Sequence, residues 1–453
     1  MRQKITNQIT EGVIWQQLLL FFFPILFGTF FQQLYNTVDA IVVGRFVGKE
    51  ALAAVGGPTG TLINLLVGFF VGLSSGATVI ISQFYGAGRG DKVCYAVHTS
   101  AAFSLLCGAG IMAVGIFGAP YALTAMGTPD DILSYAILYM RIYFLGTIPN
   151  LIYNMGSGIL RAAGDSKRPL LFLITGCVTN IVLDVVFVVI LDLGVAGAAA
   201  ATILSQTASA IFVLVVLTRT REMYQLVFSK LRLDRRMLKR IIRIGLPAGL
   251  QSVMYSLSNV IIQSSVNSLG TDTIAAWTAY GKIDCVFWMI VNAFGISVTT
   301  FVGQNYGAGK MDRVKKGIRQ CLAMTVVSSV ALSFFLYEFG FYIFEIFTTD
   351  GAVLEKGMEI LRFLVPSFVT YVTVEIYSGA LRGIGDSWLP MVLTMVGICG
   401  LRVLWIVAAV PLRRTITTVV FSYPLTWSVT TVLFIIYFHW FSRLGKKGPC
   451  QKA

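Results

Sequence analysis

The chain has 453 residues, of which 56% are hydrophobic and only 12% are charged. Soluble domains average about 25% charged residues, so the composition excludes an ordinary soluble protein and indicates a polytopic membrane protein. The net charge of +14 does not indicate a nucleic-acid-binding protein, because the basic residues cluster in alternate short loops, as the positive-inside rule predicts.

The cysteines and histidines give little support for a metalloenzyme. The seven cysteines contain no CxxC pair, and most lie in apolar runs, where cysteine behaves as a small buried hydrophobe. The two histidines, His98 and His439, are not spaced as metal ligands. The first eleven residues are polar and the first apolar run is too long for a signal-peptide core, so we expect no cleavable signal.

Apolar runs of about 20 residues or more predict twelve membrane spans. The weakest division lies between the fifth and sixth runs, which only Asp192, Leu193 and Gly194 separate. The runs cover approximately residues 14–42, 52–80, 93–118, 132–160, 168–192, 194–218, 243–268, 273–300, 316–346, 355–381, 388–411 and 415–441.

The distribution of Lys and Arg predicts that both termini lie in the cytoplasm. With that orientation the inner segments hold 26 of the 35 basic residues, and the outer loops hold about six. The segment from Thr218 to Arg243 holds nine basic residues and lies at the midpoint of the chain. We therefore expect an amino-terminal lobe at 1–218, a basic cytoplasmic linker at 219–242 and a carboxyl-terminal lobe at 243–453.

The two halves of the sequence repeat each other at one constant offset. Residues 82–93 recur at 303–314, and residues 158–166 recur at 379–387 with the same offset. Two six-span repeats in one chain predict parallel repeats related by an axis along the membrane normal. The glycines of Gly86-Ala87-Gly88 predict a structural turn rather than a phosphate loop, because the chain contains no GxxxxGK[ST] motif.

Asp39 is an acidic residue at the end of the first apolar run. Asn36 and Gln32 precede it by three and seven residues, so the three side chains share one helix face. A carboxylate at membrane depth is costly unless it faces a cavity, a partner or an ion. This face predicts a cation or proton site, with a carboxylate that reaches the headgroups as the alternative.

Span 5 carries Asn180 and Asp184 four residues apart on one face, and span 6 carries Thr202. Together with Asp39 they offer two carboxylates, an amide and a hydroxyl. Such a set could bind Na⁺ through oxygen ligands, or the two carboxylates could hold one proton. The sequence leaves both alternatives open, as well as a third in which each residue bonds locally.

Polar and aromatic stripes on spans 4 and 10 predict a shared cavity lining. Glu375 is a candidate contact for a cationic substrate or a second proton site, and a structural hydrogen bond is the alternative. The stripes comprise Tyr139, Tyr143, Asn150 and Asn154, with Met155 beside them, on span 4, and Tyr371 and Glu375 on span 10.

Three other charged residues, Lys282, Asp284 and Arg402, lie within predicted spans. We expect them to form salt bridges or to reach toward the interface. Gly68, Gly72 and Gly76 form two consecutive GxxxG steps on span 2, which predict a close helix-packing face.

The ordered set of motifs resembles the bacterial type of multidrug and toxic-compound extrusion (MATE) transporters over almost the whole chain. Single motifs are weak, and their order makes the resemblance specific. The motifs are Tyr35-Asn36-Thr37-Val38-Asp39 before Val43-Gly44, the residues 51–55, 83–88, 160–166 and 381–387, and Asn180 with Asp184 before 194–199.

This resemblance implies two six-helix bundles that form a V around a central cavity. It also implies antiport, in which cationic, often aromatic drugs leave in exchange for Na⁺ or H⁺. The family's amino-terminal cation site matches here at Asp39, Asn180, Asp184 and Thr202. One branch uses an acidic residue in helix 7, where this chain has Tyr255, so we expect coupling in the amino-terminal lobe.

We therefore predict a monomeric multidrug antiporter in the bacterial inner membrane, with a small-molecule substrate and no organic cofactor. The alternatives are a lipid-linked precursor flippase, for which Arg141, Lys282 and Arg402 supply few intramembrane cations, and a membrane enzyme, which lacks a catalytic constellation. The expected substrate-cavity residues are Gln32, Tyr35, Asn36, Tyr139, Tyr143, Asn150, Asn154, Met155, Tyr255, Asn259, Tyr371 and Glu375.

Overall fold

The computed structural model describes residues 8–442 and 444, and every regular element in these ranges is a helix. The chain divides into two compact units. The amino-terminal unit is Phe23–Gly249, and the carboxyl-terminal unit comprises the residues up to Phe22 and those from Leu250 onward. The expected lobes had their boundary in the linker 219–242, whereas these units change within helices α1 and α9, close to Pro24 and Pro247.

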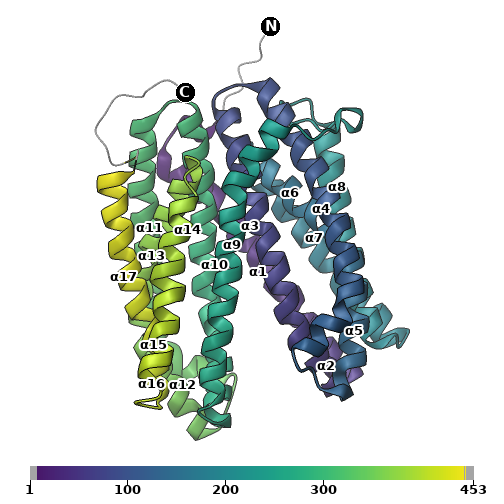
Figure 1. The fold of residues 1–453 in the computed structure, drawn as a ribbon, viewed down its shortest axis with the longest axis vertical. Helices are drawn as coiled ribbons and strands as arrows, with labels where there is room; N and C mark the ends of the chain where they lie inside the picture. The colour runs from purple at the N-terminus through teal and green to yellow at the C-terminus, as the bar shows by residue number, and fades with distance from the viewer. Residues whose placement is uncertain (1–7, 443, 445–453) are drawn as a thin grey trace. The chain divides into compact units, whose positions relative to one another are not determined.

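The first half of the chain forms long helices with short turns. Helices α7 and α8 run side by side in it (Figure 1). The elements are η1 (Gln8–Thr10), α1 (Ile14–Val42), η2 (Val43–Val47), α2 (Lys49–Gly56), α3 (Pro58–Gly86), α4 (Gly90–Ala125), α5 (Asp130–Leu145), α6 (Thr147–Ala162), α7 (Lys167–Asp184), η3 (Val185–Ile190), α8 (Gly194–Arg219) and η4 (Phe228–Lys230).

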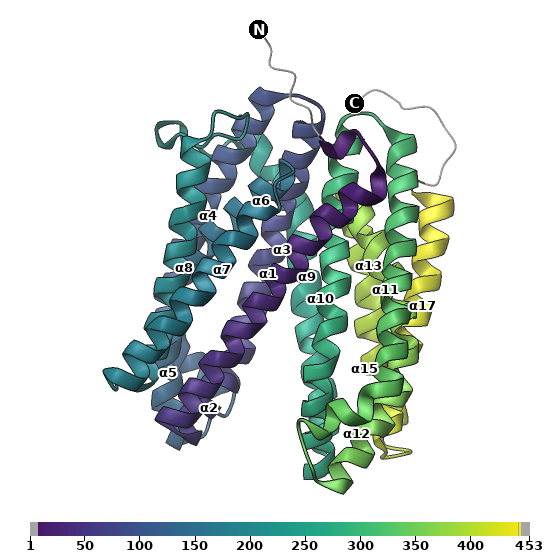
Figure 2. The same ribbon diagram turned by 180° about the vertical axis from the view of Figure 1, so that it is seen from behind.

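The second half has the same character, and α10, α11 and α13 pack against one another (Figure 2). Its elements are α9 (Arg235–Asn267), α10 (Thr271–Gly307), α11 (Met311–Glu345), α12 (Gly351–Leu364), η5 (Val365–Ser367), α13 (Phe368–Gly383), α14 (Trp388–Thr394), η6 (Met395–Gly400), α15 (Leu401–Ala409), α16 (Ile416–Val420), α17 (Ser422–Ile436) and η7 (Tyr437–Phe441).

Within the described residues, ten helical stretches are long and apolar enough to cross a membrane. The pair α5 and α6, bent by 49° at Gly146, gives an eleventh span if it crosses as one unit. The remaining predicted span, 243–268, falls in α9, which has 33 residues and a more polar sequence that includes Gln251, Asn259 and Gln263. The count of twelve therefore depends on treating the bent pair and α9 as spans.

The constant offset of the sequence repeat recurs in the helix boundaries. Corresponding helices begin at positions that differ by the same interval that separates residue 82 from residue 303. This holds for the pairs α1 and α9, α4 and α11, α6 and α13, and α7 and α14. The two halves therefore repeat in structure as well as in sequence, which makes residue-by-residue comparison between them meaningful.

The repeated glycine motifs end helices. Gly88 has φ +66° and Gly164 has φ +103°, and their counterparts Gly309 and Gly385 have φ +74° and +90°. In each case the amide of the following residue donates to a carbonyl five residues earlier, as from Arg89 to Phe84 at 3.0 Å. This is the hydrogen-bond pattern of a glycine-ended helix, so the structure confirms the interpretation as structural turns.

Glycines also allow close helix packing inside the amino-terminal unit. A Cβ at Gly72 would lie 2.6 Å from the Cα of Gly249, and one at Gly76 would lie 2.6 Å from the backbone nitrogen of Gly245. These contacts join α3 to the first part of α9. They confirm Gly72 and Gly76 as members of a helix-packing face.

Candidate functional site

A buried polar cluster lies in the amino-terminal unit, where α1, α7 and α8 approach one another. Asp39 is 9% exposed and accepts a hydrogen bond on Oδ2 from Thr202 Oγ1 at 3.3 Å. Asn180 and Asp184 are fully buried, and both lie close to the Asp39 carboxylate. The structure therefore brings together four side chains that lie as many as 163 residues apart in the sequence.

Most polar atoms of this cluster lack a hydrogen-bond partner among the described residues. These atoms are Oδ1 of Asp39, both carboxylate oxygens of Asp184, and the amide oxygen and nitrogen of Asn180. Each ionised carboxylate that is buried without a partner costs several kcal/mol. A proton shared between the carboxylates or a cation held by the oxygens would remove that cost.

The backbone around Asp184 is specialised. Asp184 ends α7, and the next six residues, Val185–Ile190, form a π-helical segment. Such segments are rare and occur often at functional sites, because the wider turn re-aims neighbouring side chains. The aliphatic residues of this segment explain why the sequence pattern resembles an uninterrupted span.

Tyrosines from two helices lie beside the carboxylates. Tyr139 is 7% exposed, and its ring stacks on that of Tyr143 with centroids 6.2 Å apart. Both Tyr139 and Tyr35 lie near enough to interact electrostatically with Asp39. The cluster is therefore bordered by aromatic rings as well as by aliphatic side chains.

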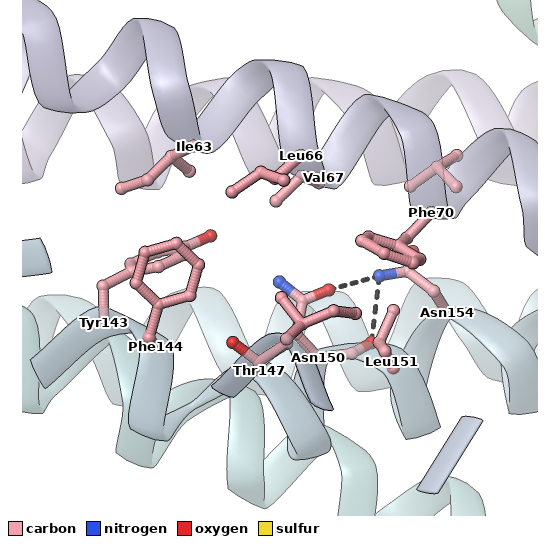
Figure 3. A pocket seen from close by; sticks show the side chains of 12 residues that line it. Ile63, Leu66, Val67, Phe70, Tyr143, Phe144, Thr147, Asn150, Leu151 and Asn154 are labelled. Carbon is pink, nitrogen blue, oxygen red and sulfur yellow. Dashed lines mark hydrogen bonds between the residues drawn. The ribbon is translucent and has the colours of Figure 1, made fainter. Parts of the chain in front are cut away.

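A pocket lies next to these tyrosines, between α3 and the bent pair α5 and α6. The space in it that a water-sized sphere can occupy is about 20 Å³. Figure 3 shows the apolar side chains of α3 across from Tyr143, Asn150 and Asn154. Asn154 Nδ2 donates to the backbone oxygen of Asn150 at 2.9 Å and to its Oδ1 at 2.5 Å, so the predicted stripe contributes a polar edge to an otherwise apolar pocket.

Three of the predicted cavity residues, Tyr143, Asn150 and Asn154, line this pocket, and Phe70 and Ile63 of α3 line it as well. Gln206 of α8, one turn after Thr202, interacts with the hydroxyl of Tyr143, and the same i, i+4 spacing could have identified it in the sequence. Met155 does not line the pocket, because this side chain is 4% exposed and packs in a hydrophobic cluster with Ile159 and other core residues.

Predicted residues of the carboxyl-terminal unit form a separate hydrogen-bonded chain. The Tyr255 and Tyr371 hydroxyls lie 3.2 Å apart, and Tyr371 donates to Glu375 Oε2 at 3.4 Å. Glu375 Oε1 accepts from Arg382 at 3.2 Å, and both side chains are about one-fifth exposed. Glu375 therefore forms structural hydrogen bonds with neighbouring side chains, which was the alternative to a substrate contact or a second proton site.

The remaining candidates are more exposed or lie elsewhere. Gln32, Asn36 and Asn259 are exposed residues on α1 and α9. Lys282 is also exposed and forms no ion pair with a described residue, and neither Asp284 nor Arg402 does so. The expected salt bridges of these three residues are thus absent from the described part of the chain.

The described residues form an internally repeated helical membrane fold with carboxylates buried inside one repeat, and buried carboxylates of this kind are typical of ion pathways in membrane transporters. The MatE family model matches residues 24–186 and 247–407, which is one match in each repeat. The chain belongs to this family, the MATE transporters, and is a transporter rather than an enzyme.

Several proteins are similar over most of their length. The probable multidrug resistance protein YoeA of Bacillus subtilis is 30% identical, and the match covers 88% of each chain. The probable multidrug resistance protein NorM of Thermotoga maritima is 24% identical over 84% of this chain and 83% of that protein. A solved MOP-superfamily transporter from Pyrococcus furiosus is 24% identical with a TM-score of 0.89, covering 96% of this chain and 98% of that one, and shares the fold.

Proposed function

We propose that the protein is a secondary multidrug antiporter that exports cationic and aromatic compounds in exchange for Na⁺ or H⁺. The observation that carries the proposal is the buried cluster of Asp39, Asn180, Asp184 and Thr202, in which all the carboxylate and amide atoms except Oδ2 of Asp39 lack hydrogen-bond partners among the described residues. The curated relatives named as multidrug resistance proteins support the same class of cargo.

The coupling ion acts by differential affinity. A transporter that alternates between two states is driven only if the ion binds one state more tightly than the other. In the described state the two carboxylates are buried beside each other, which favours a bound proton or cation. Release of that ion to the cytoplasm would leave two adjacent buried charges, which destabilises this state and favours the other one.

The pocket between α3, α5 and α6 is the proposed drug-contact surface of the amino-terminal unit. Its apolar lining and its polar edge of Tyr143, Asn150 and Asn154 suit an aromatic compound that carries a few polar groups. Tyr143 stacks on Tyr139, which interacts with Asp39. The pocket therefore adjoins the buried polar cluster of Asp39, Asn180, Asp184 and Thr202, which we call the ion cluster. A drug in the pocket would thus alter the surroundings of the carboxylates.

We further propose that the protein works as a monomer in the bacterial inner membrane with both termini in the cytoplasm. The orientation follows from the concentration of Lys and Arg in the inner segments, above all in the linker 219–242.

Efflux from proteoliposomes tests the proposed function. The purified protein is reconstituted with a fluorescent cationic dye inside, and a Na⁺ gradient or a pH gradient is imposed separately. We expect one gradient to drive dye movement against its concentration gradient, and that gradient names the coupling ion. No movement under either gradient would contradict antiport and would favour a lipid-linked precursor as the cargo.

A further inference from the structure

A buried arginine without an ion pair lies in the carboxyl-terminal unit. Arg402 of α15 is 3% exposed, and its guanidinium lies over the ring of Tyr423 at 4.2 Å. No described residue accepts a hydrogen bond from it, and its Nε is buried without a partner. Stacking on a ring satisfies part of the charge, but it leaves the N–H donors of the guanidinium free for an anion.

A carboxylate without an ion pair to a described residue also lies near Tyr423. Asp284 of α10 accepts a hydrogen bond from Trp288 Nε1 at 2.6 Å and one from the Tyr280 hydroxyl at 3.3 Å. Both Asp284 and Arg402 interact electrostatically with Tyr423. Although the two charges share this neighbour, they form no salt bridge with each other.

Aromatic rings pack against one another beside these charges. Trp288 lies 4.8 Å from Tyr371 and 6.1 Å from Trp427, and Trp427 lies 5.4 Å from Tyr423, as measured between ring centroids. Trp427 is buried, whereas Trp288, Tyr423 and Asp284 are half-buried. Half-buried aromatic faces between two opposite charges are surfaces on which an aromatic ligand can stack.

The structural repeat relates this cluster to the ion cluster and the pocket of the amino-terminal unit. At the constant offset of the repeat, Tyr423 corresponds to Thr202, and Arg402 corresponds to Ile181, which is next to Asn180. Asp284 corresponds to Ile63, one of the pocket residues of α3. The second repeat thus has a cation close to where the first repeat has its cation-binding carboxylates, and a carboxylate where the first has an aliphatic wall.

We propose that Arg402 and Asp284 form a binding site for an aromatic zwitterion. Arg402 binds the carboxylate of the ligand, Asp284 faces its cationic group, and the rings of Trp288 and Tyr423 stack on its aromatic part. This proposal rests on the proposed function and narrows its cargo from cationic aromatic compounds to those that also carry an anionic group. Two opposite, unpaired charges match such a ligand better than they match a simple cation, which Arg402 would repel.

Binding of a matched pair of dyes to the purified protein in lipid nanodiscs tests the proposal. Tetramethylrhodamine carries a free carboxylate beside its cationic ring system, and its methyl ester lacks the anion but is otherwise the same. Fluorescence anisotropy gives both dissociation constants. We expect the wild type to bind the carboxylate dye more tightly than the ester, and equal or reversed affinities would overturn the proposal without any variant.

Substitutions at Arg402 and Asp284 test whether these two residues cause the preference for the carboxylate dye over its ester. Arg402→Gln should weaken binding of the carboxylate dye about tenfold, the loss expected for one charged hydrogen bond, and should not weaken binding of the cationic ester, which Arg402 repels. Arg402→Lys should restore part of the preference, and Asp284→Asn should weaken binding of both dyes. Arg141→Gln is the matched control, because Arg141 is an exposed arginine on a membrane helix. Equal losses for both dyes in Arg402→Gln would indicate a merely structural arginine.

Failure of the proposed zwitterion site can be distinguished from failure of the proposed antiport function. If gradients drive neither dye across proteoliposomes, the proposed function is wrong, whatever the dissociation constants show. If the ester is transported normally and Arg402→Gln does not affect the carboxylate dye, antiport stands and the zwitterion site is wrong.

Discussion

Thr202 donates the hydrogen bond that Asp39 accepts within the ion cluster. The same hydroxyl lies 3.1 Å from the carbonyl of Ala198, one turn earlier in α8. Because a hydroxyl has one proton and two lone pairs, it can donate to the carboxylate or present a lone pair to a bound ion. We therefore propose that Thr202 tunes the affinity of the ion site, whereas Asp39 and Asp184 supply its charge.

Replacing Thr202 should weaken ion binding without abolishing it. Loss of one hydrogen bond costs about 1 kcal/mol, so Thr202→Ala should raise the half-saturating concentration of the coupling ion about fivefold. Thr202→Ser keeps the hydroxyl and should restore most of the affinity. Initial rates of dye efflux at graded ion concentrations measure the effect. If Thr202→Ala leaves the ion dependence unchanged, Thr202 does not take part in ion binding.

The four residues of the ion cluster could be grouped from the sequence and from the family resemblance, and the structure brings them together. Isolated carboxylates in apolar helices are conspicuous, which is why Asp39 and Asp184 can be identified directly. Pocket residues of α3 such as Ile63 could not be identified from the sequence, because they carry no charge and their helical spacing fits ordinary packing equally well. For Glu375, the sequence left open a role in binding a substrate or proton and a structural hydrogen bond. The contact with Arg382, seven residues later on α13, depends on side-chain orientations that the sequence does not specify.

At the scale of elements, small residues determine how closely α3 and α9 approach. The backbones of Gly76 and Gly245 are near enough that no side chain larger than hydrogen fits between them. Membrane helices gain little from burying apolar surface against one another, because lipid is equally apolar, and close packing supplies the stability instead.

A bulky residue at Gly76 should separate these helices. We expect Gly76→Leu to cost about 1–3 kcal/mol and to lower the melting temperature of the detergent-solubilised protein by several degrees. Gly110→Leu on α4 is the control, because a Cβ at Gly110 meets no atom within 4 Å. Equal melting temperatures for the two variants would show that the close approach does not stabilise the protein.

The ion pair between Glu375 and Arg382 should be structural. Glu375→Ala leaves Arg382 without its partner in a mostly buried position, so we expect a loss of about 2 kcal/mol in stability. The double variant Glu375→Ala/Arg382→Ala should recover part of that loss, because it removes the unpaired charge. Thermal unfolding of the purified variants measures both effects. A stable Glu375→Ala chain that has lost gradient-driven efflux would instead make Glu375 a second ion site.

At the scale of the whole molecule, one repeated architecture carries two different polar clusters. The fold class, the repeat and its offset could be read from the sequence, because apolar runs and glycine motifs recur at a fixed interval. The span count was harder at α9, where polar residues interrupt the apolar run, and at the bend between α5 and α6. The change of compact unit within α1 and α9 could not be read from composition, because both helices continue through it without a linker.

The proposed orientation predicts which loops can be labelled from outside. In a chain whose seven cysteines are replaced, Glu50→Cys should react with a membrane-impermeant maleimide in intact cells. Lys230→Cys, in the basic linker, should react only after the membrane is permeabilised. Both positions are exposed, so accessibility on the protein surface does not confound the comparison. The reverse pattern would invert the topology.

Gradient-driven efflux by carboxylate variants tests the central claim, that Asp39 and Asp184 hold the coupling ion. Proteoliposomes with wild type, Asp39→Asn, Asp184→Asn or the double variant are compared under the gradient that drives the wild type. Glu338→Gln is the control, because Glu338 is an exposed carboxylate on the membrane helix α11. We predict that each single variant loses efflux as completely as the double variant, still binds the dye, and that the control is unaffected. Normal efflux by either single variant would contradict the claim.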